Sequence, residues 1–354
     1  MGALGQMLRL LAGWLVLAGL PSAAALAQPA DALRVRVISG FAGVRQFERH
    51  EVPFWIGRVP AITGGRLLPT VLTFDRAGID PQHMLSVMRN GVVTFGVIEA
   101  NAVAMVEPEL AAADLPLVAE DLVGLRQAVT AWQPVVTGIL NDRYGADMLA
   151  TFVRPPQVMF CNRAFASLLD LAGRRVRVAS VNQSDLVMAL GARPLVVPFD
   201  RLIEAFHEGR LDCAITGALP GNGIGLHRVT SHISALPLGW AMSFLAAHQG
   251  SWAALPGEVQ AAMRLGLHEL ESEMWRAAEE EQALGMACNL GRPPCPPAER
   301  GAMVLVPESV ASRGAVRALL TAAVLPGWAR RCGITCAERW NSTVGPVLGA
   351  FARW

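Results

Sequence analysis

The chain has 354 residues, of which 53% are hydrophobic and 17% are charged, so it can bury a large core and suits two α/β lobes of roughly 100–150 residues each. The formal net charge is +1 without a basic stripe, so a nucleic-acid-binding surface is not expected. All 30 basic side chains are Arg, and the absence of Lys excludes a standard P-loop ATPase and a pyridoxal-phosphate enzyme.

The N-terminus has the pattern of a bacterial export signal. Arg9 precedes an apolar stretch at residues 10–20, and small residues stand at Ala25 and Ala27, the two positions that a signal peptidase reads. The stretch is shorter than the about 20 residues that a membrane-spanning helix needs. We therefore expect residues 1–27 to be a signal peptide that is cleaved near Ala27, which leaves a soluble periplasmic protein. An uncleaved membrane anchor is the alternative.

Strands and helices alternate through the first part of the mature chain. Alternating apolar residues predict a strand at Leu33–Ile38. A helix is predicted at residues 48–62, and Pro53 and Pro60 limit it. The next predicted elements are a strand at 67–74, a short helix at 81–90 and a strand at 92–98. This order indicates a mostly parallel sheet.

The second part of the chain repeats the alternation with shorter elements. Strands are predicted at 158–161, 175–179, 194–198 and 211–216, and helices at 184–190 and 200–208. The glycine-rich segment 216–225 could hold an anion with its backbone N–H groups. It matches neither G-x-G-x-x-G nor the P-loop pattern, and we interpret it as a flexible connector.

The longest predicted helix covers residues 256–286, where apolar residues recur in steps of three and four. At 1.5 Å per residue it would extend over roughly 45 Å. A helix of that length could bridge two lobes, and packing on one lobe alone is the alternative.

Six cysteines in an exported chain favour disulfide bonds. Sequence proximity suggests two pairs and leaves a third pair by remainder: Cys288 with Cys295, Cys332 with Cys336, and Cys161 with Cys213. These are one of fifteen possible pairings. A zinc site formed by the last four cysteines is the alternative, although their spacing fits zinc poorly.

Arg175–Val178 carries the candidate binding group. Alternate side chains of a strand share a face, so Val176 and Val178 point one way while Arg175 and Arg177 point the other. Arg177 is nearer the carboxyl end of the strand, where open α/β sheets bind ligands. Its guanidinium offers a planar fork of donors that matches a carboxylate. An ion-paired surface Arg is the alternative that the pattern alone leaves open.

No catalytic constellation is recognised in the sequence. The G-x-S-x-G elbow is missing, and His268-Glu269-Leu270-Glu271 does not match the H-E-x-x-H metal pattern. We therefore predict no catalytic residue, no metal and no cofactor, and keep a secreted hydrolase as the less favoured alternative.

Several short segments form a pattern through their order along residues 33–290. They are Thr63-Gly64-Gly65-Arg66, Asp114-Leu115-Pro116, Asp170-Leu171-Ala172-Gly173-Arg174-Arg175-Val176-Arg177, Leu190-Gly191-Ala192-Arg193-Pro194, Gly209-Arg210-Leu211-Asp212 and Trp252-Ala253-Ala254-Leu255-Pro256. This pattern resembles the solute-binding proteins of TRAP transporters, the tripartite ATP-independent periplasmic systems.

The resemblance implies a two-lobed periplasmic-binding-protein fold of the α/β class, with mixed, mostly parallel sheets and a long connecting helix. It implies a cleft that closes on a small organic acid, and membrane translocator subunits as partners. The expected first lobe comprises residues 28–153 and about 243–282. The expected second lobe comprises residues 154–242 and about 283–354. A ligand-presenting sensor or scaffold of the same fold is the alternative to transport.

The same resemblance places Arg177 at the carboxylate-binding Arg of the family. Gln157, Glu99 and Thr216 match stretches of the family that contact ligand, and Trp240 is our own addition as a wall of the cleft. Gln157 departs from the family pattern, because several acid-binding members carry a second Arg there.

Overall fold

A computed structural model describes residues 32–353 of the chain, and the predicted signal peptide at residues 1–27 lies outside these described residues. The strands are β1 (Leu33–Ile38), β2 (Leu67–Leu72), β3 (Phe95–Glu99), β4 (Ala146–Cys161), β5 (Arg175–Val178), β6 (Arg193–Val196), β7 (Cys213–Gly217), β8 (His232–His248) and β9 (Val304–Val306). The α-helices are α1 (Val59–Ile62), α2 (Phe74–Ala77), α3 (Met84–Arg89), α4 (Ala100–Val103), α5 (Leu122–Tyr144), α6 (Val181–Ala189), α7 (Leu202–His207), α8 (Ala218–Gly223), α9 (Gln249–Ala253), α10 (Gly257–Asn289), α11 (Val310–Leu319), α12 (Leu325–Cys332) and α13 (Ile334–Leu348).

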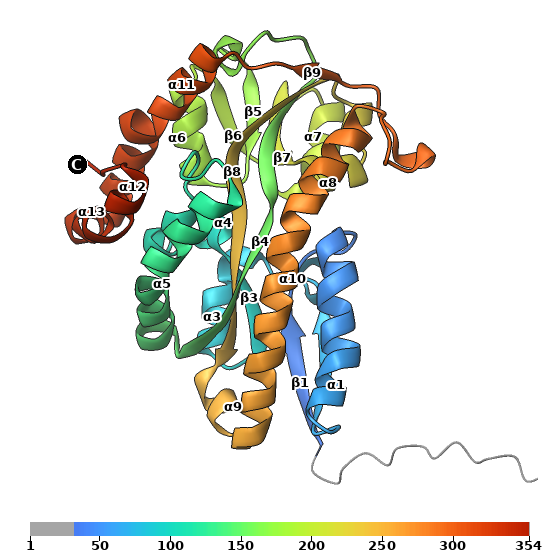
Figure 1. Cartoon of the computed structure of the whole chain (residues 1–354), viewed down its shortest axis with the longest axis vertical. Coiled ribbons are helices and arrows are strands. Elements are labelled where there is room, and N and C mark those ends of the chain that lie inside the picture. The colour runs from blue at the N-terminus through green and yellow to red at the C-terminus, as the bar shows by residue number, and fades with distance from the viewer. Residues whose placement is uncertain (1–31, 354) are drawn as a thin grey trace, which may run out of the picture.

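Two long strands, β4 and β8, connect the two halves of the sheet. The sheet order is β2-β1-β3-β8-β4-β7-β5-β6, with β9 beside β8. The strand β3 pairs with residues 243–247 of β8, which in turn pair with the first half of β4. The strand β7 pairs with residues 157–161, the second half of β4. The sheet therefore divides into a first lobe around β1–β3 and a second lobe around β5–β7 (Figure 1).

The strands of the two lobes run toward each other. The strands β1, β2 and β3 run in the direction of β4, whereas β5, β6 and β7 run opposite to it. Because the first group is level with the first half of β4 across β8, and the second group borders its second half, their carboxyl ends face each other. We call this zone the lobe junction; it contains the residues at and just after these strand ends. Ligands of α/β sheets bind at such carboxyl edges.

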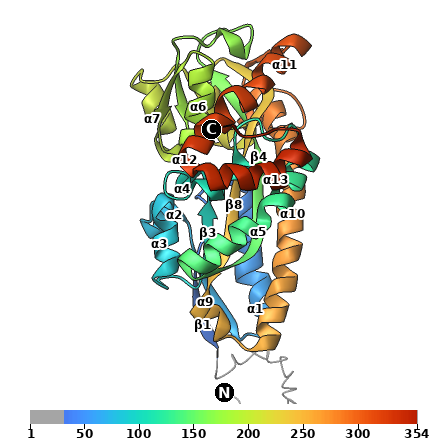
Figure 2. The ribbon, with the colours of Figure 1, turned by 90° about the vertical axis from the view of Figure 1, so that its left-hand side faces the viewer.

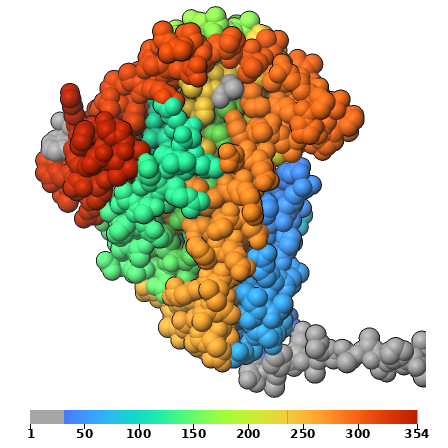
Figure 3. Space-filling model, in the orientation of Figure 1, coloured from blue at the N-terminus to red at the C-terminus, as the bar shows by residue number. Residues whose placement is uncertain are grey.

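The helix α10 runs along both lobes and confirms the long helix expected at residues 256–286 (Figures 1 and 3). In the first lobe its apolar residues Met263 and Leu267 pack with Phe95 and Phe152 of the sheet. In the second lobe its Met286 packs against a separate core that contains Phe160 and Ala214. We call the side of the sheet that α10 covers the α10 face.

The prediction that residues 216–225 form a flexible connector is wrong, because this segment contains the helix α8. The helix α8 packs against α10 at a position where the backbones of the two helices come close. A Cβ added at Gly285 of α10 would lie 2.3 Å from the backbone nitrogen of Leu219. The glycine therefore permits the contact, and helix packing outweighs the weak helix propensity of the glycine-rich sequence.

The helix expected at residues 48–62 is present but has an unusual pitch. Two π-helical segments, Phe47–Glu51 and Pro53–Arg58, precede α1. Proline has no backbone N–H and its ring displaces the carbonyl one turn earlier, so Pro53 accounts for the wider turn.

The cysteines pair as sequence proximity suggested. Cys161–Cys213 joins directly opposite residues of β4 and β7. Cys288–Cys295 closes the end of α10, and Cys332–Cys336 joins α12 to α13.

The C-terminal helices lie across the boundary between the lobes (Figure 2). The helix α13 packs on α5 of the first lobe, while α12 contacts α6 of the second lobe. Among the helices of residues 32–353, none combines the length and apolar character that crossing a lipid bilayer requires.

Candidate functional site

Arg177 lies at the carboxyl end of β5, inside the lobe junction. Its side chain is 4% exposed. The Nε atom donates to the backbone oxygen of Val197 over 2.8 Å, and Nη1 donates to that of Ile215 over 2.8 Å. These carbonyls belong to the neighbouring strand β7 and to the segment after β6, so the sheet itself fixes the guanidinium in place.

Arg177 has no acidic partner among the described residues, since both of its hydrogen bonds go to neutral carbonyls. Burial alone lowers its pKa to about 10, which still leaves the side chain charged at neutral pH. A buried charge without a counter-ion is costly unless an ion pairs with it. The arrangement therefore has the chemistry of an anion site.

Arg154, which the sequence analysis did not single out, is a second buried guanidinium. It stands on β4, and its Nη2 donates to Glu99 Oε1 over 2.9 Å. Burial would lower its pKa, but the carboxylates of Glu99 and Glu51 outweigh burial and raise it. Its Nη1 is buried and has no hydrogen-bond partner within residues 32–353. Its position next to Glu99 depends on the packing of β3 and β4 in the sheet, so no local sequence pattern singled it out.

Strand alternation places both guanidiniums on the α10 face. Arg154 is two residues from Phe152, which packs with α10. Arg177 is the register partner of Ala214, which belongs to the core that the end of α10 covers. By the same alternation Glu99 and Thr216 also lie on this face. The structure thus brings both Arg side chains to one side of the sheet.

Gln157 and Trp240, two of the other expected residues, belong to the opposite face. Gln157 is opposite Gly217 on β7 and next to Val158, which lies on the α10 face. Its side-chain oxygen accepts a hydrogen bond from Gln183 of α6. Trp240 is 4% exposed, and its Nε1 donates to the backbone oxygen of Ala119 over 3.1 Å. Both residues line the lobe junction from the side that α6 covers.

The lobe junction is closed in this structure. Ser39, Thr73, Arg177 and Thr216 stand at strand ends from both lobes, and each is at most 4% exposed. Phe41 after β1 and Phe199 after β6 are in contact, with ring centroids 6.5 Å apart. Water is therefore largely excluded from the two guanidiniums, which strengthens their pull on an anion.

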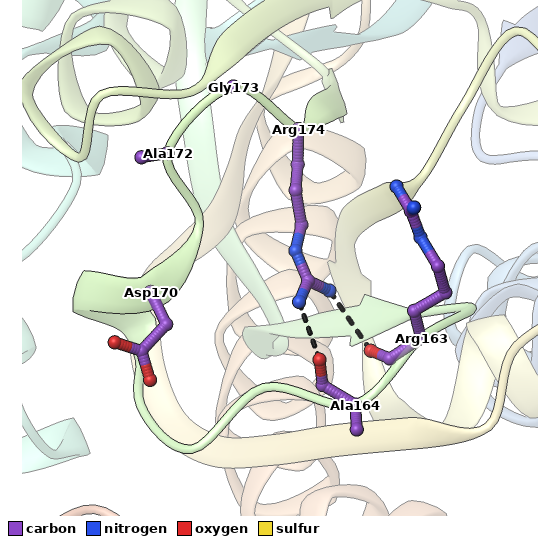
Figure 4. Close-up of a pocket in the computed structure, with 6 residues that line it drawn as sticks. All are labelled: Arg163, Ala164, Asp170, Ala172, Gly173 and Arg174. Atoms are coloured by element: carbon purple, nitrogen blue, oxygen red, sulfur yellow. Dashed lines mark hydrogen bonds between the residues drawn. The ribbon is translucent and has the colours of Figure 1, made fainter.

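Two hollows on the outer surface are weaker candidates. One, of about 480 Å³, is lined by Arg163, Asp170 and Arg174 on the second lobe (Figure 4). Arg174 donates to the backbone oxygens of Arg163 and Ala164 there (Figure 4). Exposed charges at such a site are screened by water and salt. The other, of about 870 Å³, lies between α5 and α10 and is lined mainly by apolar atoms.

Comparison with known proteins places this geometry among solute receptors. The family model described as bacterial extracellular solute-binding protein, family 7, matches residues 51–286. A comparison with curated proteins found no match.

Solved structures share the fold over nearly the whole chain. DctP7 of Bordetella pertussis, an extracytoplasmic solute receptor binding pyroglutamic acid, has 19% identity and a TM-score of 0.76, covering 88% of this chain and 99% of its own. A TRAP periplasmic solute-binding protein from Desulfovibrio salexigens with bound orotic acid has 17% identity and a TM-score of 0.77, covering 89% and 98%. A TRAP solute-binding protein from Rhodoferax ferrireducens with copurified benzoate has 18% identity and a TM-score of 0.75, covering 90% and 98%. At these identities the likeness establishes the fold.

Proposed function

Because the chain belongs to the family 7 bacterial extracellular solute-binding proteins, we propose that it captures a small organic carboxylate between its lobes. It then delivers this ligand to the membrane subunits of a TRAP-type transporter. The proposal includes an exported, periplasmic protein from which the signal peptide is removed near Ala27. It assigns binding, and no catalytic step, to the lobe junction.

One observation carries the proposal: Arg177 is a buried, charged guanidinium whose hydrogen-bond partners are two neutral carbonyls. A ligand carboxylate supplies the missing negative charge. Three neighbours in fold bind pyroglutamate, orotate and benzoate, and each of these is a carboxylate. Gln157, Thr216, Glu99 and Trp240 stay our candidates for the remaining walls of the site.

The position of the two Arg residues explains how ligand could drive closure. Arg177 belongs to the second lobe, and Arg154 with its unpartnered Nη1 stands where β4 leaves the first lobe. A ligand that binds Arg177 and also contacts groups on the other side of the lobe junction is held better by the closed form than by either lobe alone. A ligand shifts a conformational equilibrium by this difference in affinity.

The test measures binding of L-pyroglutamate, orotate and benzoate by thermal shift and by titration calorimetry. We expect at least one acid to raise the melting temperature, because a ligand that binds only the folded state stabilises it. Arg177→Ala should abolish that binding, since loss of one partner of a desolvated pair costs about 2–5 kcal/mol. Arg177→Lys should weaken it strongly, because the planar fork is lost.

Arg175→Ala is the matched control. Arg175 stands two residues away on the same strand but forms an ion pair with Asp212 at 3.0 Å near the surface. This variant should keep the affinity of the native chain. Unchanged affinity in Arg177→Ala, or no binding of any of the three acids, would contradict the proposal.

A further inference from the structure

Glu51 is a buried carboxylate that the proposed function leaves without a role. It is 0% exposed and lies in the π-helical segment Phe47–Glu51, two residues before Pro53. Ser39, at the end of β1, donates its hydroxyl to Oε2. The other oxygen, Oε1, is buried and has no partner among the described residues. Widened turns of this kind recur at functional sites.

The surroundings of Glu51 contain further unpartnered atoms. Arg154 and Glu99 are close enough to Glu51 to influence its ionisation. The Nη1 atom of Arg154, the hydroxyl of Ser243 and the Oε1 atom of Gln46 are also buried without partners within residues 32–353. Each such group destabilises a closed structure, because it has lost its water without gaining a hydrogen-bond partner. Ser243 is the register partner of Glu99. Gln46 Nε2 donates to the backbone oxygen of Val153, next to Arg154. Unpartnered atoms gathered in this way indicate a site that atoms of a ligand are to fill.

Whether each unpartnered atom is a donor or an acceptor specifies the chemistry of the ligand group that would fit it. Arg154 Nη1 is a donor suited to a carboxylate, whereas Glu51 Oε1 accepts hydrogen bonds. Three carboxylates, those of Glu51, Glu99 and Glu281, act on the single guanidinium of Arg154. Burial raises the pKa of Glu51 in spite of Arg154, so the protein groups alone stabilise this charge poorly. A donor from the ligand would satisfy Oε1 and stabilise the carboxylate.

We propose that Glu51 accepts a hydrogen bond from an amino or hydroxyl group that stands close to the carboxylate of the ligand. The substrate class is then the amino- or hydroxy-carboxylates, in preference to plain carboxylates of the same shape. This inference rests on the proposed function, because it takes capture of a carboxylate at the lobe junction as given. Glu51 is a specificity-determining residue in this scheme, and Arg177 supplies affinity common to both classes.

The test uses pairs of acids that differ only in the donor group. The pairs are L-proline with cyclopentanecarboxylate, L-malate with succinate, L-phenylalanine with 3-phenylpropionate, and L-mandelate with phenylacetate. Titration calorimetry should show that the donor-bearing member of at least one pair binds about tenfold or more tightly than its partner. This factor corresponds to one hydrogen bond to a charged group.

Variants of Glu51 separate the role of this residue from that of Arg177. Glu51→Met should remove the preference within the pair while the plain member keeps its affinity. Glu51→Gln is isosteric and keeps an acceptor without the charge, so it should reduce the preference in part; it decides the question if Glu51→Met does not fold. Glu48→Met is the matched control, since Glu48 lies on the same helical segment but is exposed.

The outcomes distinguish the two proposals. Equal binding of both members of every pair, with loss of both in Arg177→Ala, overturns the role of Glu51 and leaves the proposed function standing. If the preference for the donor-bearing acid survives in both Glu51→Met and Glu51→Gln, the role of Glu51 is likewise overturned and the proposed function still stands. No binding by any member of any pair contradicts both proposals.

Discussion

Two Arg residues on one short strand have opposite surroundings. The side chain of Arg175 donates two hydrogen bonds of 3.0 Å each to the carboxylate of Asp212, and its backbone N–H donates a third of 2.9 Å. The side chain of Arg177, in contrast, donates hydrogen bonds only to backbone carbonyl oxygens. The contrast shows how position along a strand separates a structural ion pair at its start from an anion site at its carboxyl end.

Asp212 gives a prediction about acid stability. Its hydrogen bonds with Arg175 lower its pKa to about 2, below the ordinary value of 3.8. A carboxyl group whose pKa is lowered on folding stabilises the protein above the unfolded pKa and loses that effect as pH falls toward the folded pKa. We expect Asp212→Asn to lower the free energy of unfolding by about 1–2 kcal/mol at pH 7, after allowance for the partly exposed Arg175.

The measurement is urea denaturation at pH 7 and near pH 2.5. The difference between native chain and Asp212→Asn should shrink at the lower pH. Asp200→Asn is the control, because Asp200 is an exposed acid whose contact with Arg201 is 3.9 Å. A destabilisation that is equal at both pH values would show that the ion pair is not its cause.

Glu281 gives a prediction of the opposite sign. It lies on α10, and burial raises its pKa to about 7 although Arg45 and Arg154 partly compensate. An acid whose pKa is raised on folding opposes stability once pH exceeds the unfolded pKa, and the effect is complete above the folded pKa. Glu281→Gln should therefore raise the free energy of unfolding by about 2–3 kcal/mol at pH 8.

At pH 4.5 the same variant should have the same free energy of unfolding as the native chain, because the carboxyl group of Glu281 is then largely protonated in the folded protein. Denaturant melts at the two pH values measure this difference. Glu279→Gln, at an exposed position two residues away on the same helix, should change stability at neither pH. Stabilisation that is independent of pH would contradict the assignment.

At the scale of the elements, the contact between α8 and α10 depends on Gly285. We expect Gly285→Ala to destabilise the protein by about 2–4 kcal/mol, because the added methyl would overlap the backbone of Leu219 and overpacking strains a core. Gly138→Ala on α5 is the matched control, since nothing lies within 4 Å of the added Cβ. It should stabilise the chain by about 0.5–1 kcal/mol through helix propensity.

Chemical denaturation of both variants measures this prediction. If Gly285→Ala left the free energy of unfolding unchanged, the two helices could move apart without a loss of stability. Packing against α10 would then no longer explain why the glycine-rich segment 218–223 is helical.

The sequence predicted elements whose signal is local and missed those whose signal depends on partners. Alternation indicated β1 and β5, and the apolar steps indicated α10. The long strands β4 and β8 carry no clear alternation, because both of their faces are buried in the middle of the sheet. The helix α5 contains Pro134, and it was not predicted.

The candidate site was predictable to a similar extent. Arg177 could be selected because a charged residue near the end of a short strand is a local feature. Arg154 and Glu51 could not, because their importance comes from contacts between β4, β3 and the helix after β1, which are far apart in sequence. Pairing across the lobe junction is decided by the sheet order, and the sequence does not display it.

On the scale of the whole molecule, the C-terminal helix α12 is attached to both lobes. Trp328 Nε1 donates to the backbone oxygen of Pro108 in the first lobe over 2.8 Å. One turn later, Arg331 Nη2 donates to Asn182 Oδ1 of α6 in the second lobe over 2.7 Å, and the residue also pairs with Asp185. Trp328 is fully buried against Trp132 and Trp340, so the attachment to the first lobe is the stronger one.

Opening of the lobes should therefore break the contacts of Arg331 and keep those of Trp328. We expect Arg331→Ala to shift the ligand-free protein toward open forms by about tenfold, because it removes a partly buried ion pair that exists only in the closed form. Pulsed electron spin resonance between labels at Gln82→Cys and Asp200→Cys, which lie on different lobes, measures the separation. Arg330→Ala, the exposed neighbour, is the control, and an unchanged distance distribution in Arg331→Ala would show that α12 moves freely with one lobe.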